Sequence, residues 1–373
     1  MNHRERILST IRGQPVDRIP WAPRWELWFN AAQRDGRLPE KYRGWHIYDV
    51  TRDLGMGIKS HYRDAWREVL HDVEVREVQK GHETLVEYVT PAGTASMVWK
   101  RTAELEAQAV RGLRTKYLVS GPEDYGPVLF MLEHTEIIPQ HENLQAELDS
   151  IGNDGCALVH AGHCPASSAM IEYLGHEQFY YELHDHPDLL LQLLDALERV
   201  RDQTVSVVAD SAAAIASLDG NYDMAITPPP VYRRFFLPYF KKAVSRLHSA
   251  GKLVSTHVDG DNRQLLELIL ESGFDIGEAF TSPPMTHLTV RDAQEAWGQK
   301  MAIWGGIAST FFRSEASREE FETQVLDILD CAQTNGHLVL GTGDNVPTDG
   351  DLDRVRWVTA AVEEYGQPAH LPL

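Results

Sequence analysis

The chain has 373 residues, of which 43% are hydrophobic and 24% charged, a balance typical of a globular protein with a sizeable core. Its formal net charge of −20 argues against a nucleic-acid partner, and no apolar run approaches the ~20 residues of a membrane span. Three cysteines without a CxxC pair indicate neither a disulfide framework nor a thiolate zinc site, and the charged N-terminus has no secretory pattern, so we expect a cytoplasmic protein.

The first 60 residues predict one helix and two strands. The amphipathic opening MNHRERILSTIRG predicts the helix, and DRIPWAP (17–23) and LGMGIKS (54–60) predict strands one and two. The first loop region is rich in aromatic residues, Trp21, Trp25, Trp28 and Phe29. These side chains suit either an aromatic substrate or a core beneath the N-terminal helix.

Residues 61–150 predict an insertion after strand two. Within it, HETLVEYVTPAGTASMVWKRT alternates polar and apolar residues on either side of Pro91-Ala92-Gly93. Such alternation around a turn is typical of a β-hairpin.

From residue 150 onward, short apolar runs alternate with helical patterns. The runs cover residues 155–162, 212–220, 252–260, 274–280, 301–307 and 337–344, and they are apolar on both faces, as buried parallel strands are. His186-Pro187 predicts a break between two helices, and Ser317 with Glu320 forms a capping-box pattern. Together with strands one and two, these runs predict an α/β fold, a single-domain (β/α)8 TIM barrel over residues 1–373 with an N-terminal helix and the hairpin insertion.

Polar residues occur at nearly every predicted strand end. In such barrels the chemistry lies at the C-terminal ends of the strands, so these positions are candidate site residues. They are Arg24 and Glu26, His160 and His163, Asp219 and Asn221, His257 and Asp259, Glu278, Asp344 and Asn345.

Structural explanations remain open for several of these residues. Asp219 and Asp344 each adjoin a glycine and suit Asx-turns. His160 suits a hydrogen-bonded core histidine equally well. Glu278 is harder to explain in this way, since a lone carboxylate in a buried strand is costly.

The pair His257-x-Asp259 places both side chains on one face if the strand continues to Asp259. With Glu278 and Asp344 they would supply one imidazole and three carboxylates, a reasonable site for a divalent metal, most simply Zn²⁺. Without a cation the three carboxylates would repel one another. The alternative is that His257 and Asp259 only cap the end of the strand.

Several segments, in order, resemble the uroporphyrinogen decarboxylase-like superfamily over essentially the whole chain. They are RERILSTIRGQPVDRIPWAPR, LPEKYRGWHIYDVTRDLGMGI, VTPAGTASMVWKRT, PPPVYRRFFLPYFKKAVSRLHSAGKLVSTHVDGD and IWGGI. The resemblance implies the same barrel and exposed helices of the kind that often support a homodimer.

The branches of that superfamily differ at the site. The decarboxylase branch works without a metal and uses first-loop arginines, typically in MRQAGRY, whereas this chain has PRWELWF, in which only Arg24 matches. The corrinoid-linked methyltransferase branch holds zinc with a His-x-Cys pair, a Glu, and a Cys after the last strand. By position, His257 matches the histidine, Asp259 and Asp344 stand at the two cysteines, and Glu278 lies near the glutamate.

An all-N/O site is a harder Lewis acid than a thiolate site and is better matched to a substrate oxygen. The resemblance therefore implies a demethylating methyltransferase that moves a methyl group from a small O-methyl or N-methyl donor to a corrinoid (cobalamin) on a separate partner protein. The residues themselves indicate only the metal and the oxygen. Catalytic roles are expected for His257, Asp259 and Asp219, and substrate contacts for Arg24, His160, His163, Asn221 and Tyr222.

Two other functions remain open. The chain could be a metal-independent decarboxylase, with Asp219 or Asp259 transferring protons and Arg24 binding a carboxylate. It could also be a barrel that binds a ligand without catalysis, although so many ionisable groups at one mouth favour an enzyme.

Overall fold

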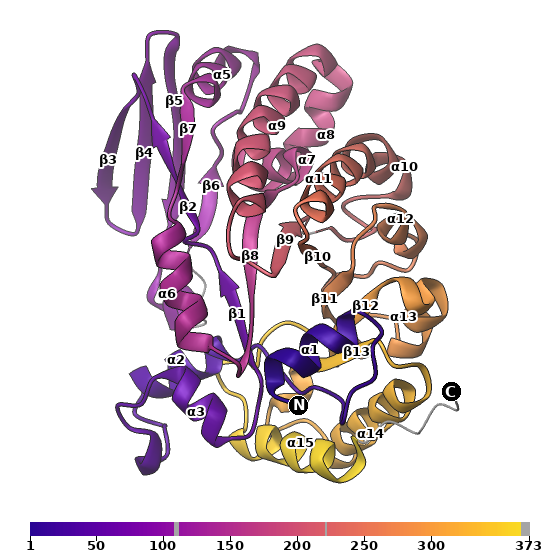
Figure 1. The fold of residues 1–373 in the computed structure, drawn as a ribbon. Helices are drawn as coiled ribbons and strands as arrows, with labels where there is room; N and C mark the ends of the chain where they lie inside the picture. The colour runs from indigo at the N-terminus through magenta and orange to yellow at the C-terminus, as the bar shows by residue number, and fades with distance from the viewer. Residues whose placement is uncertain (108–111, 221, 367–373) are drawn as a thin grey trace.

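A computed structural model of the protein describes residues 1–107, 112–220 and 222–366. Its centre is a curled parallel sheet of seven strands in the order β1-β8-β9-β10-β11-β12-β13 (Figure 1). The strands are β1 (Ile58–Tyr62), β8 (Gly155–His163), β9 (Ile215–Asp219), β10 (Leu253–His257), β11 (Ile276–Phe280), β12 (Ala302–Ile307) and β13 (Leu338–Thr342). All six runs expected after residue 150 are thus strands of one parallel sheet.

The expected first strand, residues 17–23, is reduced to a single bridge between Trp21 and Leu340. Leu340 N–H donates to the carbonyl of Pro20 (2.8 Å), and Gly57 N–H donates to the carbonyl of Trp21 (2.8 Å). This segment therefore links β13 to the chain just before β1, the two edges of the sheet. Pro20 and Pro23 have no N–H to donate, which explains why no longer ladder forms.

The second expected strand is displaced toward the C-terminus. Residues 54–57 are not strand, because α3 (Ile47–Asp53) extends almost to Gly55, whose positive φ of 71° ends the helix, and β1 begins only at Ile58. The shift has a consequence for the site, since it places Lys59 and His61 inside the strand.

The insertion contains the predicted hairpin and more. β4 (Glu83–Thr90) and β5 (Gly93–Lys100) pair antiparallel around Pro91-Ala92, which confirms the hairpin. β3 (Glu74–Lys80) and β6 (Leu113–Lys116) extend it to four strands, and β2 (Trp66–Leu70) pairs with β7 (Thr135–Pro139). Ala95 of the hairpin belongs to the same hydrophobic cluster as residues of β8 and β9, and Tyr88 and Met97 of the hairpin pack against that cluster.

Helices surround the sheet, and the insertion packs beside α9 (Figure 1). The predicted break at His186-Pro187 separates α8 from α9, and the Ser317 side chain accepts from Glu320 N–H at the start of α14. Besides α3, the α-helices are α1 (His3–Ile11), α2 (Glu26–Arg34), α4 (Ala103–Ala107), α5 (Tyr125–Glu133), α6 (His141–Ile151), α7 (Pro165–Ser168), α8 (His176–Asp185), α9 (Pro187–Ala209), α10 (Pro229–Val231), α11 (Leu237–Ser249), α12 (Leu266–Glu271), α13 (Val290–Trp297), α14 (Arg318–Asn335) and α15 (Leu352–Tyr365).

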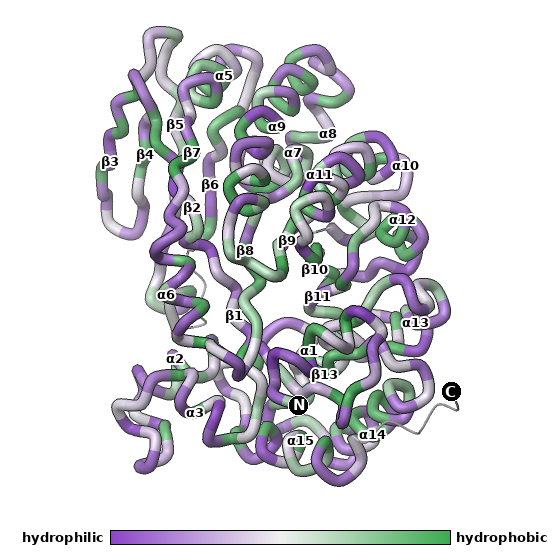
Figure 2. The backbone as a smooth tube through the Cα atoms, viewed as in Figure 1, coloured by the Kyte–Doolittle hydropathy of each residue, from purple (hydrophilic) through white to green (hydrophobic). Residues whose placement is uncertain are grey.

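The core lies between the sheet and these helices. Figure 2 shows hydrophobic positions along β9, β10 and β11, whose side chains are mostly buried. Trp25, Trp28 and Phe29 are also buried, at the start of α2, so these aromatic residues belong to the core. They lie in the larger hydrophobic cluster, whereas Ile7 and Ile11 of α1 belong to a second one, so the expected position beneath the N-terminal helix is not observed. Among the helices of the described residues, none has both the length and the apolar character to cross a membrane.

Candidate active site at the C-terminal ends of the strands

A buried charge network crosses the interior of the curled sheet. Glu278 on β11 is fully buried and accepts from Lys59 Nζ on β1 at 2.5 Å. Its other oxygen, Oε2, lies 2.6 Å from Nδ1 of His257 on β10. Nε2 of His61 is 3.1 Å from Glu278 Oε1 but outside hydrogen-bond geometry. The network thus joins three strands, of which β1 is not a neighbour of the other two.

The backbone of β11 is irregular directly after Glu278. The pairing with β12 shifts register between Glu278 and Phe280, and Ala279 between them has a positive φ of 57°, which is rare for a residue with a side chain. Opposite this bulge, a Cβ on Gly305 would lie 2.6 Å from the backbone N and O of Phe280, so only glycine fits there. Strain of this kind is concentrated at functional sites, where it fixes the direction of a side chain.

The charges in the network determine its protonation. Burial disfavours the ionised form of Glu278, but Lys59, His61 and His257 outweigh it and hold the pKa of this carboxyl well below its ordinary value. Burial would likewise lower the pKa of His257, whereas Glu278 and Asp259 raise it well above its ordinary value. Burial lowers the pKa of His61, which favours its neutral form.

His257 and Asp259 face the same side, as the period of two predicts. Nε2 of His257 lies 3.3 Å from Oδ2 of Asp259. The ladder continues past the last residue of β10, since Val258 N–H donates to the carbonyl of Glu278 (2.8 Å). Both nitrogens of His257 therefore lie beside carboxylates, one in the core and one, on Asp259, at the partly exposed mouth.

Arg24 forms a second group with Asp344. Its Nη1 donates to Asp344 Oδ1 at 2.8 Å, and Nε lies 4.0 Å from Glu26 Oε2. Burial opposes the charge of Arg24, but Asp344, Glu278, Glu26 and Asp219 together raise its pKa.

The third group is centred on Asp219. Its Oδ2 lies 3.1 Å from Nδ1 of His160, and its Oδ1 accepts from Ser217 Oγ at 2.6 Å. Burial would raise the pKa of Asp219, yet the histidines His160 and His163 bring it below its ordinary value. Burial, followed by the charge of His160, lowers the pKa of His163 to about 4, so this ring is neutral at physiological pH.

Two expected substrate contacts have other outcomes. Tyr222 is 1% exposed, and its hydroxyl lies 2.9 Å from Oγ1 of Thr256. Its ring packs edge-on against Tyr232 and Phe236, so Tyr222 is a core residue and does not reach the mouth. Asn221 lies outside the described residues.

The four predicted metal ligands are not gathered around one point. Both oxygens of Glu278 are bonded within the network, and Asp344 is paired with Arg24. Across residues 1–107, 112–220 and 222–366, no group of three or more His, Cys, Asp or Glu side chains is arranged to hold a metal ion. What the structure provides is the pair His257 Nε2 and Asp259 Oδ2.

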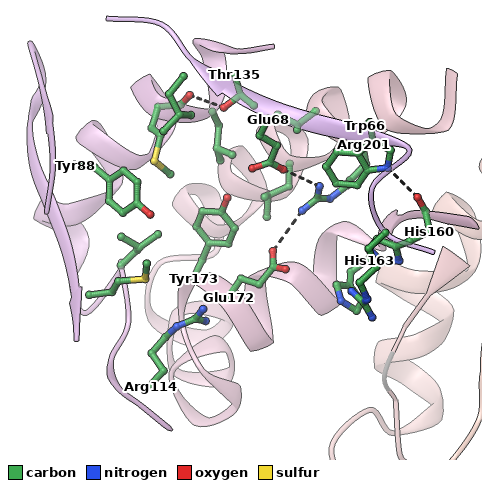
Figure 3. A pocket seen from close by; sticks show the side chains of 18 residues that line it. Trp66, Glu68, Tyr88, Arg114, Thr135, His160, His163, Glu172, Tyr173 and Arg201 are labelled. Atoms are coloured by element: carbon green, nitrogen blue, oxygen red, sulfur yellow. Dashed lines mark hydrogen bonds and ion pairs between the residues drawn. The ribbon is translucent and has the colours of Figure 1, made fainter. Parts of the chain in front are cut away.

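Lys59 and His61 were not predicted as site residues. The segment GIKSH carries them two positions apart, which places both side chains on one face of a strand. A cavity beside the Asp219 group, where Arg114, Glu172 and Arg201 lie, was also not predicted (Figure 3). Those residues come from the insertion and from helices, and no strand-end pattern points to them.

The curled parallel sheet of seven strands, with ionisable groups at its strand ends, defines an α/β protein with a half-barrel architecture. The uroporphyrinogen decarboxylase (URO-D) family model matches residues 158–365, more than half of the chain, and the protein belongs to this family. A uroporphyrinogen decarboxylase from Myxococcus xanthus (strain DK1622) is 26% identical over 185 residues, covering 49% of this chain and 50% of that protein. The chain thus matches half the length of this curated relative.

A methyltransferase from Methanosarcina mazei has a similar structure. The two align with a TM-score of 0.62 over 98% of this chain and 99% of the other, at 15% sequence identity. At that identity the likeness establishes the shared fold, and it extends over the insertion as well as the sheet.

Proposed function

We propose that the protein is a methyltransferase that removes a methyl group from an oxygen or nitrogen of a small donor and passes it to a reduced corrinoid on a partner protein. The observation that carries the proposal is the position of His257. Its Nε2 lies 3.3 Å from Oδ2 of Asp259 at the mouth, while its Nδ1 is held by the buried Glu278.

His257 and Asp259 supply two donors of the kind that would hold a divalent metal such as Zn²⁺, one fewer than the three protein ligands usual for catalytic zinc. Zinc bonds to nitrogen and oxygen of about 2.0–2.2 Å place two donors on one tetrahedral ion roughly 3.4 Å apart. A metal-bound histidine commonly donates its other N–H to a carboxylate, which orients the ring, and Glu278 occupies that position. Outweighing burial, Glu278 and Asp259 raise the pKa of His257 and so favour a proton on its ring, and a metal at Nε2 would take the place of that proton.

Such an ion supplies Lewis acidity that stabilises the charge on an oxygen as its methyl group departs. The chain's own residues have separate tasks in this proposal. Lys59 keeps Glu278 ionised, and Glu278 fixes the orientation of His257. Arg24 and His160 border the mouth and bind the donor, and Asp219 holds His160 in position.

The metal content of the purified protein tests the proposal. Wild-type protein prepared without chelator and dialysed against micromolar zinc is expected to retain about one zinc ion per chain by mass spectrometry of the metal. His257→Gln and Asp259→Asn should each lose it while remaining folded. His287→Gln, an exposed histidine paired with Asp261, is the matched control and should retain it. Wild-type protein without zinc, or variants that keep it fully, would overturn the metal site.

A second function is supported by a different observation. Lys59 and Arg24 compensate Glu278 and Asp344 without any added ion, so the repulsion expected from the sequence does not arise. A metal-independent decarboxylase requires such an arrangement, with Arg24 binding a substrate carboxylate. Release of carbon dioxide from a carboxylated substrate by metal-free protein would favour this alternative.

A further inference from the structure

A cavity of about 450 Å³ lies beside the mouth, between the insertion and α9 (Figure 3). The insertion contributes Trp66, Glu68, Tyr88 and Arg114, and α9 contributes Arg201. His160 and His163, at the end of β8, connect the cavity to the Asp219 group. Its volume is within the range of roughly 300–1,000 Å³ that is usual for small-molecule sites.

The cavity presents hydrogen-bond donors that the protein does not use. Nε of Arg114, Nε of Arg201 and Nδ1 of His163 are buried without a hydrogen-bond partner among the described residues. The hydroxyls of Tyr88 and Tyr173 also line the cavity and bond to no residue in the part of the chain that the structure describes. Buried donors are rarely left unsatisfied, so a ligand rich in acceptor oxygens would complete them.

The two arginines differ in their charge compensation. Arg201, almost fully buried, lies 3.3 Å from Glu68 and 3.4 Å from Glu172. Arg114 forms no ion pair with an acid of the described residues, and its Nη1 donates to the carbonyl of Ile171 (2.5 Å). Burial lowers the pKa of Arg114. Its guanidinium carbon lies 4.4 Å from the ring centroid of Trp99 and 5.2 Å from that of Tyr117, so aromatic rings and no paired carboxylate of the described residues provide the compensation it has. An anion beside Arg114 would supply a full opposite charge.

The rest of the wall is apolar and aromatic. The indole of Trp66 stacks on His160 with ring centroids 6.2 Å apart, and it donates from Nε1 to the carbonyl of the same residue at 2.8 Å. Met97, Leu118, Met131 and Leu197 supply hydrocarbon contacts. A ligand that fills this space therefore carries an apolar body of ring size as well as an anionic end.

We propose that this cavity binds an organic carboxylate with a ring-sized apolar body, its carboxylate beside Arg114. The inference rests on the proposed function only in taking this ligand as the methyl donor, whose body would extend from the mouth past His160 and His163. Binding itself needs neither metal nor corrinoid.

Isothermal titration calorimetry with 2-naphthoate, on metal-free full-length protein, tests the proposal. Its neutral counterpart 2-naphthalenemethanol has the same body without the charge. We expect saturable binding of 2-naphthoate, at least tenfold tighter than the alcohol. Arg114→Gln should weaken 2-naphthoate at least tenfold and leave the alcohol nearly unchanged. Arg67→Gln, an exposed arginine on β2 outside the cavity lining, is the matched control and should bind as wild type.

Arg114→Lys keeps a cation and provides a second variant if Arg114→Gln does not fold. A several-fold loss of 2-naphthoate affinity is expected for it, because an ammonium does not reproduce the two-pronged contact of a guanidinium with a carboxylate. Equal affinity for acid and alcohol, or wild-type affinity in the folded variants, would overturn the proposal. Because the titration contains no corrinoid, a failure of methyl transfer with intact 2-naphthoate binding would contradict the proposed function alone.

Discussion

Lys59 and Glu278 form an ion pair of 2.5 Å across the interior of the sheet, with their side chains 0% and 1% exposed. They lie 219 positions apart in the chain, on strands that are not neighbours. The ammonium also lies 5.1 Å from the ring centroid of Trp304. This pair ties β1 to the half of the sheet that carries His257, so the site geometry depends on it.

Removing the charge of Glu278 should destabilise the protein strongly. Glu278→Gln leaves Lys59 buried without its anion, and breaking such a pair typically costs about 3–5 kcal/mol. Urea unfolding at pH 7 should show a fall of that order in the free energy of unfolding. Glu295→Gln, at an exposed position in α13 that forms no ion pair with any described residue, is the control and should change it by less than about 0.5 kcal/mol. Equal free energies of unfolding for the two variants would show that the Lys59–Glu278 pair does not stabilise the protein.

Stability should fall with acid because of His163. Its folded-state pKa of about 4 is below the ordinary 6.5. The unfolded chain therefore binds this proton first, and the contribution of the neutral ring, present above pH 6.5, is lost as the pH falls toward 4. Relative to His163→Gln, wild-type protein should lose up to about 3 kcal/mol over that range.

The measurement is the free energy of unfolding from pH 8 to pH 4. His287→Gln, at an exposed histidine, should run parallel to wild type. If the free energy of unfolding of His163→Gln has the same pH dependence as that of wild type, the pKa of His163 is the same in the folded and unfolded protein.

The packing behind Glu278 should tolerate no added methyl group. A Cβ on Gly277 would lie 2.6 Å from the ring of Trp297, which is itself buried and bonded through Nε1 to the carbonyl of Leu266 (3.1 Å). Overpacking of this kind typically costs about 1–3 kcal/mol, so Gly277→Ala should lower the melting temperature. Gly126→Ala, in α5 with its nearest contact at 3.7 Å, should raise it slightly. Thermal unfolding followed by circular dichroism distinguishes the two variants. An unchanged melting temperature for Gly277→Ala would show that the Trp297 ring moves to make room for the methyl group.

Local patterns predicted the strands after residue 150 and the shared face of His257 and Asp259, because strand periodicity depends only on neighbouring residues. They did not predict the ion pairs. Whether Lys59 meets Glu278, or Arg24 meets Asp344, depends on how distant strands face one another across the interior. The repulsion between Glu278 and Asp344 that favoured a metal in the sequence is relieved by Lys59 and Arg24, whose positions the sequence did not reveal.

The first strand and Tyr222 show a second limit. The run DRIPWAP has the apolar character of a strand, but its prolines leave a single bridge at Trp21. Tyr222 follows a strand end, yet the chain turns it into an aromatic cluster with Tyr232 and Phe236. Position after a strand therefore identifies a candidate, and only the three-dimensional path of the loop decides whether it reaches the mouth.

Methyl transfer that depends on His257 can be followed in a single assay. Zinc-loaded protein is mixed with reduced cobalamin and a panel of methyl ethers and methylamines, including methoxy-substituted aromatic carboxylates, and the absorbance of methylated cobalamin is followed. We predict its formation with wild type and with His287→Gln, and a loss of at least 100-fold in rate with His257→Gln. No methylation by wild type across the panel, together with carbon dioxide release from a carboxylated substrate in the absence of metal, would contradict the proposed methyl transfer.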